Sequence, residues 1–263
     1  MVTPDSSGDA PLVLAAQRGD EAAFRDLVER HRPALHAHCY RMLASPYDAD
    51  EAVQEALVRA WKGLPRFEGR STVRTWLFRI ATRTAIDVAR GRARRELPIG
   101  AFAPSAPGDS PGPADHDVTW MVPYPTAEAS AGLSPEATYL ERESLELAFV
   151  AALQYLPAQQ RAAFLLCDVL RYPAALAAEM LETTVAGVNS RLQRARAELR
   201  RRRTAASQVA EVERLGDATL RDLASRYARA IEESDLKALL DLLAEDAYWS
   251  MPPLRGWFDG REA

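Results

Sequence analysis

The stretch 96–135 is rich in proline, glycine, alanine and serine, and it constrains the fold more than any other feature of the chain. A segment of this composition cannot bury enough apolar surface to offset the entropy of ordering it, so we predict a flexible linker. One aromatic island, Val118–Pro125, interrupts it and favours docking of the linker on this chain or on a partner. The 263 residues are long enough for two or three small domains around such a linker.

Residues 12–95, before the linker, have the pattern of consecutive helices with short breaks. Their apolar positions recur at helical rather than alternating spacing, as at Leu27, Leu35, Tyr40 and Leu43. Asp20 predicts one helix start and Ser45–Pro46 another, because short polar residues cap helices and proline suits the first turn. A third helix is predicted from Thr72 to about Arg90.

Residues 136–203, after the linker, are also predicted to be helical. Leu145, Phe149, Leu153 and Leu156 suit one amphipathic helix, and Pro157 begins the next. A short helix over 174–181, a turn over 182–184 and a longer helix from Val185 then give the layout of a helix-turn-helix motif. Its second helix ends in arginines and could enter a major groove while holding the flanking phosphates.

Residues 217–263 form a third segment, with two predicted amphipathic helices followed by a short strand at YWSM. This segment offers little to bury Trp249 and Trp257 and is a poor candidate for a complete domain. The fold class predicted for the chain is therefore mainly α: two helical domains joined by a flexible linker, with a partial α+β segment at the end.

The charges are sorted along the chain, although the net charge is only −4. One basic run extends from Arg70 to Arg95 and contains a single acid, Asp87, and another extends from Asn189 to Arg203 and contains only Glu198. Each run ends a candidate DNA-binding helix. Two separated basic runs indicate two contacts with a polyanion rather than two solvated helix faces.

Several function classes are not indicated. There is no apolar run of membrane-spanning length, no secretory signal, and no phosphate-binding, dinucleotide or hydrolase motif. Cys39 and Cys167 form no CxxC, which fits a reducing cytoplasm. His31, His36, His38 and Cys39 cluster in sequence, but His36 and His38 diverge on a helix. We therefore expect no metal site, no cofactor and no catalytic residues.

The two helical blocks resemble those of extracytoplasmic-function (group 4) sigma factors of the sigma-70 family. The resemblance rests on DADEAVQEALVRAWKGLPRFEGRSTVRTWLFRIATRTAIDVAR in the first block, and on LPAQQRAAFLLCDVL followed by VAGVNSRLQRARAEL in the second. It implies sigma region 2 at 12–95 and region 4 at 136–203. The linker motif WMVPYP and the ending DLLAEDAYWSMPPLRGWFDGREA resemble the subgroup with a C-terminal SnoaL-like domain, of which 217–263 would be a truncated part.

The resemblance assigns roles to residues of the first block. It implies that an acidic helix face grips RNA polymerase, and complementary charge suits a basic partner helix: Asp48, Asp50, Glu51, Gln54 and Glu55. It implies that a loop and the following helix capture a flipped base of the promoter −10 element and melt the duplex: Phe67, Arg70, Ser71, Thr72, Trp76, Arg79, Arg83, Asp87 and Arg90. Arg83 stands where family members often carry Asn.

In the second block the resemblance implies a helix that reads the −35 element, since Arg and Asn can bond base edges bidentately: Thr184, Val185, Ala186, Asn189, Ser190, Arg191 and Arg194. Position suggests phosphate contacts for Arg196, Arg200 and Arg201. Two departures stand out: Leu176 replaces the usual Glu, and Glu182 replaces the usual turn Gly. Because Glu does not readily adopt positive φ, we expect a different turn at Glu182.

The function expected is that of a sigma factor. The chain would bind core RNA polymerase, recognise and melt promoter DNA and start transcription without catalysing a reaction itself, with the C-terminal segment as a built-in regulator. One alternative is a stand-alone helix-turn-helix regulator, which would bind its promoter tightly without polymerase. Another is a SnoaL-like enzyme with an N-terminal targeting domain, which would show turnover or ligand binding in the tail.

Overall fold

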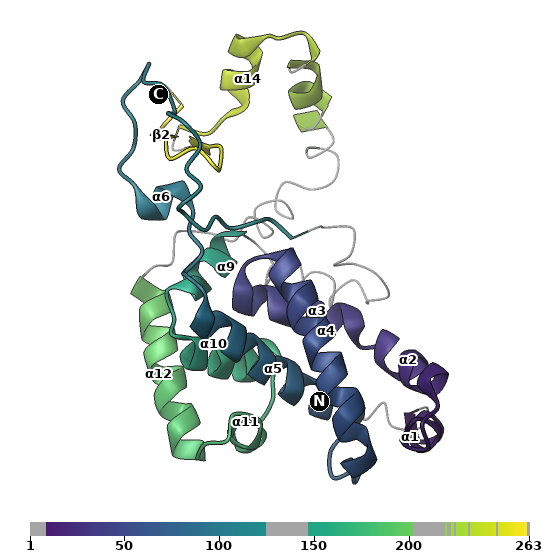
Figure 1. Cartoon of the computed structure of the whole chain (residues 1–263). Coiled ribbons are helices and arrows are strands. Elements are labelled where there is room, and N and C mark those ends of the chain that lie inside the picture. Colours follow the sequence, from purple (N-terminus) through teal and green to yellow (C-terminus); the bar gives the residue numbers. More distant parts are fainter. Residues whose placement is uncertain are drawn as a thin grey trace. The chain divides into compact units, whose positions relative to one another are not determined.

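The computed structural model describes residues 9–124 and 147–201, and from residue 219 onward residues 219, 222–223, 225–230, 232–245 and 247–261. The chain divides into two compact units (Figure 1). The first unit combines the described residues up to Arg94 with those of 122–203, and the second combines Arg95–Met121 with those from 204 onward. No helix among the described residues is long and apolar enough to cross a membrane.

The first unit begins with helices joined by short turns, which we call the N-terminal block. They are α1 (Asp9–Gln17), α2 (Glu21–Glu29), α3 (Arg32–Leu43), α4 (Pro46–Gly63), a single 3-10 turn η1 (Leu64–Arg66) and α5 (Val73–Gly91). Helices α3, α4 and α5 pack against one another around a core that includes Leu35, Tyr40, Val53, Leu77 and Phe78. This packing confirms the mainly helical class.

The predicted helix starts are confirmed by their caps. The Asp20 carboxylate accepts from the N–H groups of Ala22 (3.0 Å) and Ala23 (3.1 Å). The Ser45 hydroxyl accepts from Asp48 N–H (3.2 Å) ahead of Pro46. The Thr72 hydroxyl accepts from Thr75 N–H (3.1 Å), so Thr72 begins α5 as a cap. Each cap satisfies backbone donors that a helix start leaves without partners.

The described part of 136–203 forms the second block. It contains α9 (Leu147–Gln154), α10 (Ala158–Phe164), the π-turn η2 (Leu165–Val169), α11 (Ala174–Met180) and α12 (Val185–Arg201). Leu145 lies outside the described residues. Helix α12 buries Val188, Leu192 and Ala195 at i, i+4 and i+7 against α10 and α11. The helix-turn-helix arrangement of α11 and α12 is therefore the one that the sequence predicts.

The two blocks pack together within the first unit, and Figure 1 shows α10 between α12 and α5. Arg161 of α10 is 6% exposed, and its guanidinium donates to the carbonyls of Met42, Gln154 (3.2 Å) and Leu156 (3.0 Å) and to the side-chain oxygen of Gln154 (2.6 Å). Met42 belongs to α3 of the N-terminal block. The buried Arg161 side chain thus helps to join the blocks by bonding carbonyls that burial would otherwise leave without donors.

The end of the aromatic island docks on the N-terminal block. The Tyr40 hydroxyl donates to the carbonyl of Val122 (3.1 Å), and the rings of Tyr40 and Tyr124 lie 4.8 Å apart. His36 Nε2 donates to the carbonyl of Pro46 (3.2 Å), so the Tyr124 hydroxyl donates to His36 Nδ1 (2.8 Å). Burial raises the pKa of Tyr40 to about 12. Pro125 and the rest of the predicted linker, 126–135, lie outside the described residues.

The second unit is built from the first part of the linker and the C-terminal segment. It contains α6 (Pro98–Ala101), α14 (Leu236–Leu242) and an antiparallel pair, β1 (Tyr248–Ser250) and β2 (Trp257–Asp259), with Trp249 opposite Phe258. Strand β1 lies at the YWSM segment where the sequence predicts a strand, and β2 pairs with it further along the chain.

The described linker residues of this unit make specific contacts that composition does not predict. Trp257 is buried, its indole N–H donates to the carbonyl of Phe102 (2.9 Å), and its carbonyl accepts from Ser105 N–H (2.7 Å). A Cβ on Gly256 would lie 2.6 Å from the Cα of Pro111, so only glycine allows this close approach. The buried indole supplies the apolar surface that the linker lacks.

Candidate nucleic-acid interface

Helix α12 presents the residues assigned to −35 recognition on its solvent side. Val185, Ala186, Asn189, Ser190 and Arg194 are exposed, opposite the buried row of α12. The Thr184 hydroxyl accepts from Gly187 N–H (3.0 Å), so Thr184 caps the helix as well as lying at its exposed start. Arg191 is half-buried. This face can lie in a major groove with its amide, hydroxyl and guanidinium groups towards base edges and phosphates.

The turn between α11 and α12 does not change type in the way that we expected from Glu182. Glu182 adopts φ 49°, the left-handed conformation that a turn glycine would take, and the backbone continues into α12. The N–H of Thr183 donates to the carbonyl of Ala178 (2.9 Å), which closes the end of α11. The expectation of a different turn is therefore wrong, because the backbone of Glu182 adopts the left-handed conformation that a residue with a Cβ disfavours.

Helix α5 carries the residues assigned to −10 reading on one face. Arg79, Asp87 and Arg90 are exposed and Arg83 is half-buried, in the i, i+4 and i+3 order that the spacing predicts. The Asp87 carboxylate forms ion pairs with the guanidinium groups of Arg59 (3.3 Å) and Arg90 (3.8 Å). The face is therefore basic at Arg79 and Arg90 and partly neutralised between them.

Trp76 is not exposed on this face. It is 6% exposed, and its ring lies 4.9 Å from that of Phe67. Trp76 therefore packs against Phe67, and its own ring is too buried to stack with a base. Phe67 is half-buried and keeps part of its ring accessible.

The loop before α5 is fastened to the first helix. Gln17 at the end of α1 donates to the carbonyls of Leu64 (3.1 Å) and Phe67 (2.8 Å). Gly69 has φ 70°, which lets the loop reverse direction before the cap at Thr72. A pocket lies between α1 and the loop, lined by Leu14, Phe67, Glu68, Gly69, Ser71 and Thr72 among others. The assigned loop residues Ser71 and Thr72 therefore meet in one concave site.

The acidic residues of α4 divide into buried and exposed members. Asp48 is 8% exposed and forms an ion pair with Arg92, which also pairs with Glu51 (2.6 Å). These carboxylates raise the pKa of Arg92, with the hydrogen bond to Asp48 contributing most. Asp50, Glu51, Gln54 and Glu55 are exposed. Asp48 thus joins α4 to the end of α5, and the other four face solvent.

Two exposed apolar residues flank this acidic face and were not picked out from the sequence. Tyr47 is 74% exposed and Val58 is 47% exposed. They lie eleven residues apart, three turns of one helix, on the same side as Glu51 and Gln54. The detectable signal was their position out of phase with the buried Ala49, Val53, Ala56 and Ala60. Exposed apolar groups within a polar face are typical of protein contact surfaces.

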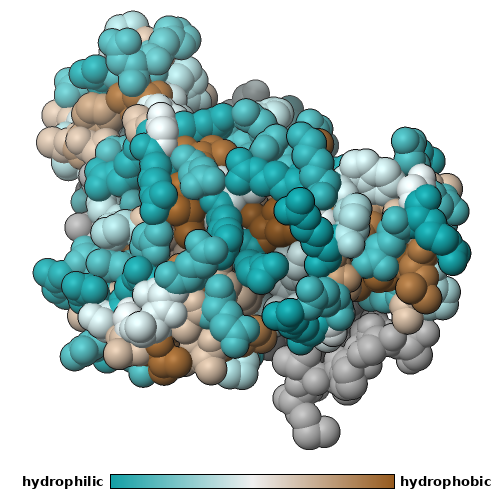
Figure 2. Space-filling model, turned by 60° about the horizontal axis from the view of Figure 1, so that its bottom comes forward, coloured by the Kyte–Doolittle hydropathy of each residue, from teal (hydrophilic) through white to brown (hydrophobic). Residues whose placement is uncertain are grey.

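Several arginines of the basic runs already have acidic partners. Arg196 forms a two-point contact with Asp168 (2.8 and 2.6 Å), which raises the pKa of Arg196, and Arg201 pairs with Glu198. Figure 2 shows a mostly hydrophilic face with hydrophobic residues in small patches. Because Arg196 is engaged with Asp168 and Arg194 is exposed, Arg194 is better placed than Arg196 to offer its guanidinium to a partner.

The histidines and Cys39 have separate structural contacts. His31 lies 3.8 Å from Asp9, His36 bonds Pro46 and Tyr124, and His38 Nε2 bonds the Thr82 hydroxyl (2.9 Å). Burial raises the pKa of the Cys39 thiol to about 12. Within the ranges described above, no three potential metal ligands come together.

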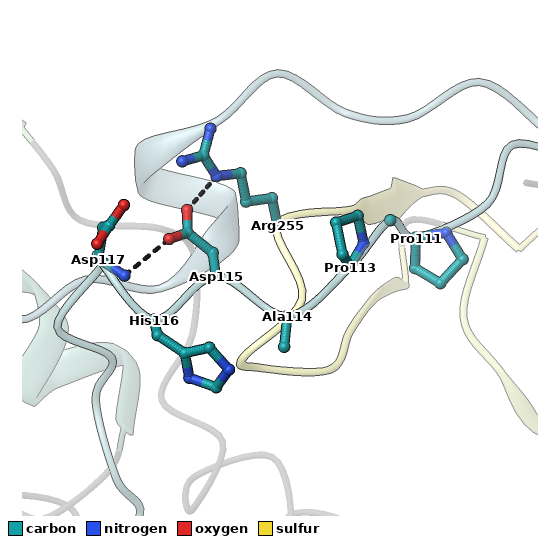
Figure 3. A pocket seen from close by; sticks show the side chains of 8 residues that line it. Pro111, Pro113, Ala114, Asp115, His116, Asp117 and Arg255 are labelled. Atoms are coloured by element: carbon teal, nitrogen blue, oxygen red, sulfur yellow. Dashed lines mark hydrogen bonds and ion pairs between the residues drawn. The ribbon is translucent and has the colours of Figure 1, made fainter.

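The second unit has a pocket of its own near the turn before β2. Figure 3 shows the Asp115 carboxylate between the guanidinium of Arg255 and the backbone N–H of Asp117 (2.9 Å). The hydrogen bond from Arg255 is the main cause of a lowered pKa at Asp115. Pro111, Pro113 and Ala114 line the same pocket. The ion pair between Asp115 and Arg255 holds the linker against the C-terminal segment.

Comparison with known proteins matches both blocks. Residues 27–95 match Sigma-70 region 2, and residues 146–199 match Sigma-70, region 4. The ECF RNA polymerase sigma factor SigG of Mycobacterium tuberculosis (strain ATCC 25618 / H37Rv) is 41% identical over 262 residues, covering 100% of this chain and 69% of SigG. SigM of the same strain is 33% identical over 193 residues, covering 73% of this chain and 83% of SigM.

A solved structure agrees at the level of fold. The extracytoplasmic function sigma factor SigJ of Mycobacterium tuberculosis aligns with a TM-score of 0.52 and 21% identity, over 89% of this chain and 71% of that one.

The two matched regions and the exposed polar faces of α5 and α12 define a DNA-binding transcription factor of the sigma-70 type. The chain belongs to the ECF RNA polymerase sigma factors. It accordingly binds RNA polymerase and DNA and directs the polymerase to promoters, and it does so without being an enzyme.

Proposed function

We propose that three exposed helix faces of the first unit divide the work of promoter recognition. The face of α4 with Asp50, Glu51, Gln54 and Glu55 docks on core polymerase, the loop at Phe67 with α5 contacts the −10 element, and α12 contacts the −35 element. The observation that carries the proposal is that α12 buries every third or fourth residue and leaves Asn189, Ser190 and Arg194 in solvent. A helix packed in this way presents a preformed reading surface.

The chemistry of each face supports its assigned partner. Tyr47 and Val58 give the α4 face apolar anchors within an acidic surround, which suits a partner surface with basic and apolar groups. Arg79 and Arg90 supply positive charge for a DNA backbone, and the pocket beside Ser71 and Thr72 offers polar groups to an extruded base. Asp48 holds α4 to Arg92 in this proposal and contributes to docking only indirectly.

Two variants separate polymerase docking from promoter reading. Asp50→Lys is expected to weaken binding to core polymerase about tenfold, because it places a cation where a basic partner is proposed.

Asn189→Ala is expected to leave that binding unchanged and to lower initiation at a −35-dependent promoter about tenfold, through loss of a base contact. Fluorescence anisotropy with core polymerase and in vitro transcription measure the two effects.

The matched control for the first variant is Asp26→Lys, the same change at an exposed residue of α2. Equal loss of polymerase binding in Asp26→Lys and Asp50→Lys would remove α4 as the docking face. A gel shift with and without polymerase tests the stand-alone regulator, which predicts tight promoter binding by the chain alone.

We also propose that the C-terminal segment is SnoaL-like and regulates transcription through the linker. The support is that described residues on both sides form one compact unit, with Trp257 on Phe102 and Gly256 on Pro111. While residues 95–121 are held in this unit, they are not free to thread a polymerase channel. The free thiols of Cys39 and Cys167 are consistent with action in a reducing cytoplasm.

Gly256→Ala should release the linker, because its Cβ would overlap the backbone of Pro111. We expect transcription by the reconstituted holoenzyme to rise about fivefold, a coupling of ordinary size between two sites. The control is Gly91→Ala, where the added Cβ meets no atom within 4 Å. Faster proteolysis of the linker in Gly256→Ala would show that the linker is released. If transcription by this variant were then unchanged, the regulatory proposal would be wrong.

A further inference from the structure

One arginine assigned to the −10 helix is held by the turn of the helix-turn-helix motif. Arg83 Nε donates to the carbonyl of Met180 (3.3 Å), and its guanidinium forms an ion pair with the Glu182 carboxylate. Met180 ends α11 and Glu182 lies in the turn before α12. A side chain from the N-terminal block is thus bound at the centre of the motif in the second block.

The backbone conformation of Glu182 indicates that its carboxylate has a functional role. Its φ of 49° lies in the left-handed region, which glycine adopts freely and residues with a Cβ disfavour. The side chain is 71% exposed, so it contributes little to the core. What glutamate offers here and glycine would not is a negative charge within reach of Arg83.

Buried contacts nearby fix the distance between the two blocks. Arg161 bonds the carbonyl of Met42, Gln154 Nε2 donates to the carbonyl of Arg41 (3.4 Å), and the rings of Phe78 and Tyr172 lie 6.2 Å apart in an edge-on arrangement. This packing places the turn beside α5, and the Arg83–Glu182 ion pair adds one specific contact between the turn and α5.

We propose that Glu182 acts as an internal substitute for a DNA phosphate and occupies Arg83 while the chain is free. We call the pair, with the Met180 carbonyl, the Arg83–Glu182 latch. A carboxylate and a phosphate both accept charge-assisted hydrogen bonds from a guanidinium, so the latch and DNA compete for Arg83. The proposal rests on the proposed role of α5. In the holoenzyme the two blocks bind separate promoter elements, and the latch is open.

The test measures binding of the full chain, without polymerase, to a fluorescent single-stranded oligonucleotide that carries the −10 segment of a promoter transcribed by the holoenzyme. Glu182→Gln and Glu182→Gly are expected to raise affinity about two- to fivefold, the range for loss of one exposed ion-pair competitor. Glu182→Gly also relieves the left-handed strain, so unfolding cannot explain a change. Adding Arg83→Ala to Glu182→Gly should cancel the gain.

Glu179→Gln is the matched control, because it removes the same charge from an exposed residue of α11. An equal gain in Glu179→Gln would show that net charge alone is responsible and would overturn the latch, as would unchanged affinity in both Glu182 variants. Arg83→Ala in the holoenzyme tests α5 separately. If Arg83→Ala leaves promoter opening by the holoenzyme unaffected, the proposed role of α5 is wrong. If Arg83→Ala impairs promoter opening but the Glu182 variants bind DNA with unchanged affinity, only the latch is wrong.

Discussion

Replacing Arg161 by methionine is expected to lower the free energy of unfolding of the chain by about 3 kcal/mol, because buried carbonyls lose their donors. The guanidinium donates to the carbonyls of Met42, Gln154 and Leu156, and methionine has no donor to replace it. Burial lowers the pKa of Arg161 to about 10, so the side chain is still a cation at neutral pH. Urea unfolding followed by circular dichroism at 222 nm measures the loss.

Arg161→Lys serves as the comparison, since it keeps the charge but cannot bond several carbonyls at once. It should recover less than half of the lost stability. A stability equal to wild type in Arg161→Met would mean that water or a rearranged Gln154 satisfies the carbonyls, and the proposed tie between the blocks would be wrong.

Local signals carried much of the fold. Asp20, Ser45 and Thr72 cap the helices that periodicity predicts, and each cap depends on residues only two or three positions away. The helix-turn-helix was predictable for the same reason, because the spacing of Val188, Leu192 and Ala195 fixes which side of α12 is buried. Contacts of this kind join residues that are close in the chain, so they can be predicted from the sequence alone.

Long-range contacts were not predictable in the same way. The sequence does not show that Arg161 would bond Met42 or that Arg83 would meet Glu182, since 119 positions separate the first pair and 99 separate the second. The linker shows the same limit. Its composition predicts a flexible linker, yet Phe102 and Pro111 gain partners in Trp257 and Gly256, which only the tertiary structure supplies.

The candidate site was predicted as sets of residues, but the sequence did not show which members are accessible. Asp48 and Trp76 share helices with the other assigned residues, yet both are buried, Asp48 against Arg92 and Trp76 against Phe67. A helix of three to four residues per turn leaves the edge of a face undetermined by spacing alone. Neighbouring elements decide whether an edge residue meets solvent.

His38 makes the fold sensitive to acid through its burial. It is fully buried, Nε2 donates to the Thr82 hydroxyl, which in turn donates to the carbonyl of Phe78 (2.7 Å), and Nδ1 has no hydrogen-bond partner in the described part of the chain. A second proton on Nδ1 would lack an acceptor. Burial, helped by the charge of Arg41, lowers the pKa of His38 to about 3 from its ordinary value of 6.5.

The folded chain should therefore lose stability as the pH falls from about 6.5 towards 3, because the unfolded chain takes up a proton that the folded chain refuses. Between pH 8 and pH 5 the loss expected from His38 is about 2 kcal/mol, from a difference of about 1.5 pH units below the unfolded pKa. His38→Gln keeps a donor for Thr82 but cannot titrate in this range. Urea unfolding at pH 5, 6, 7 and 8 should show a slope in wild type that is flatter in His38→Gln by this amount, with His31 and His36 present in both. Parallel slopes in the two proteins would mean that His38 accepts its proton without unfolding and that its site is less closed than the contacts indicate.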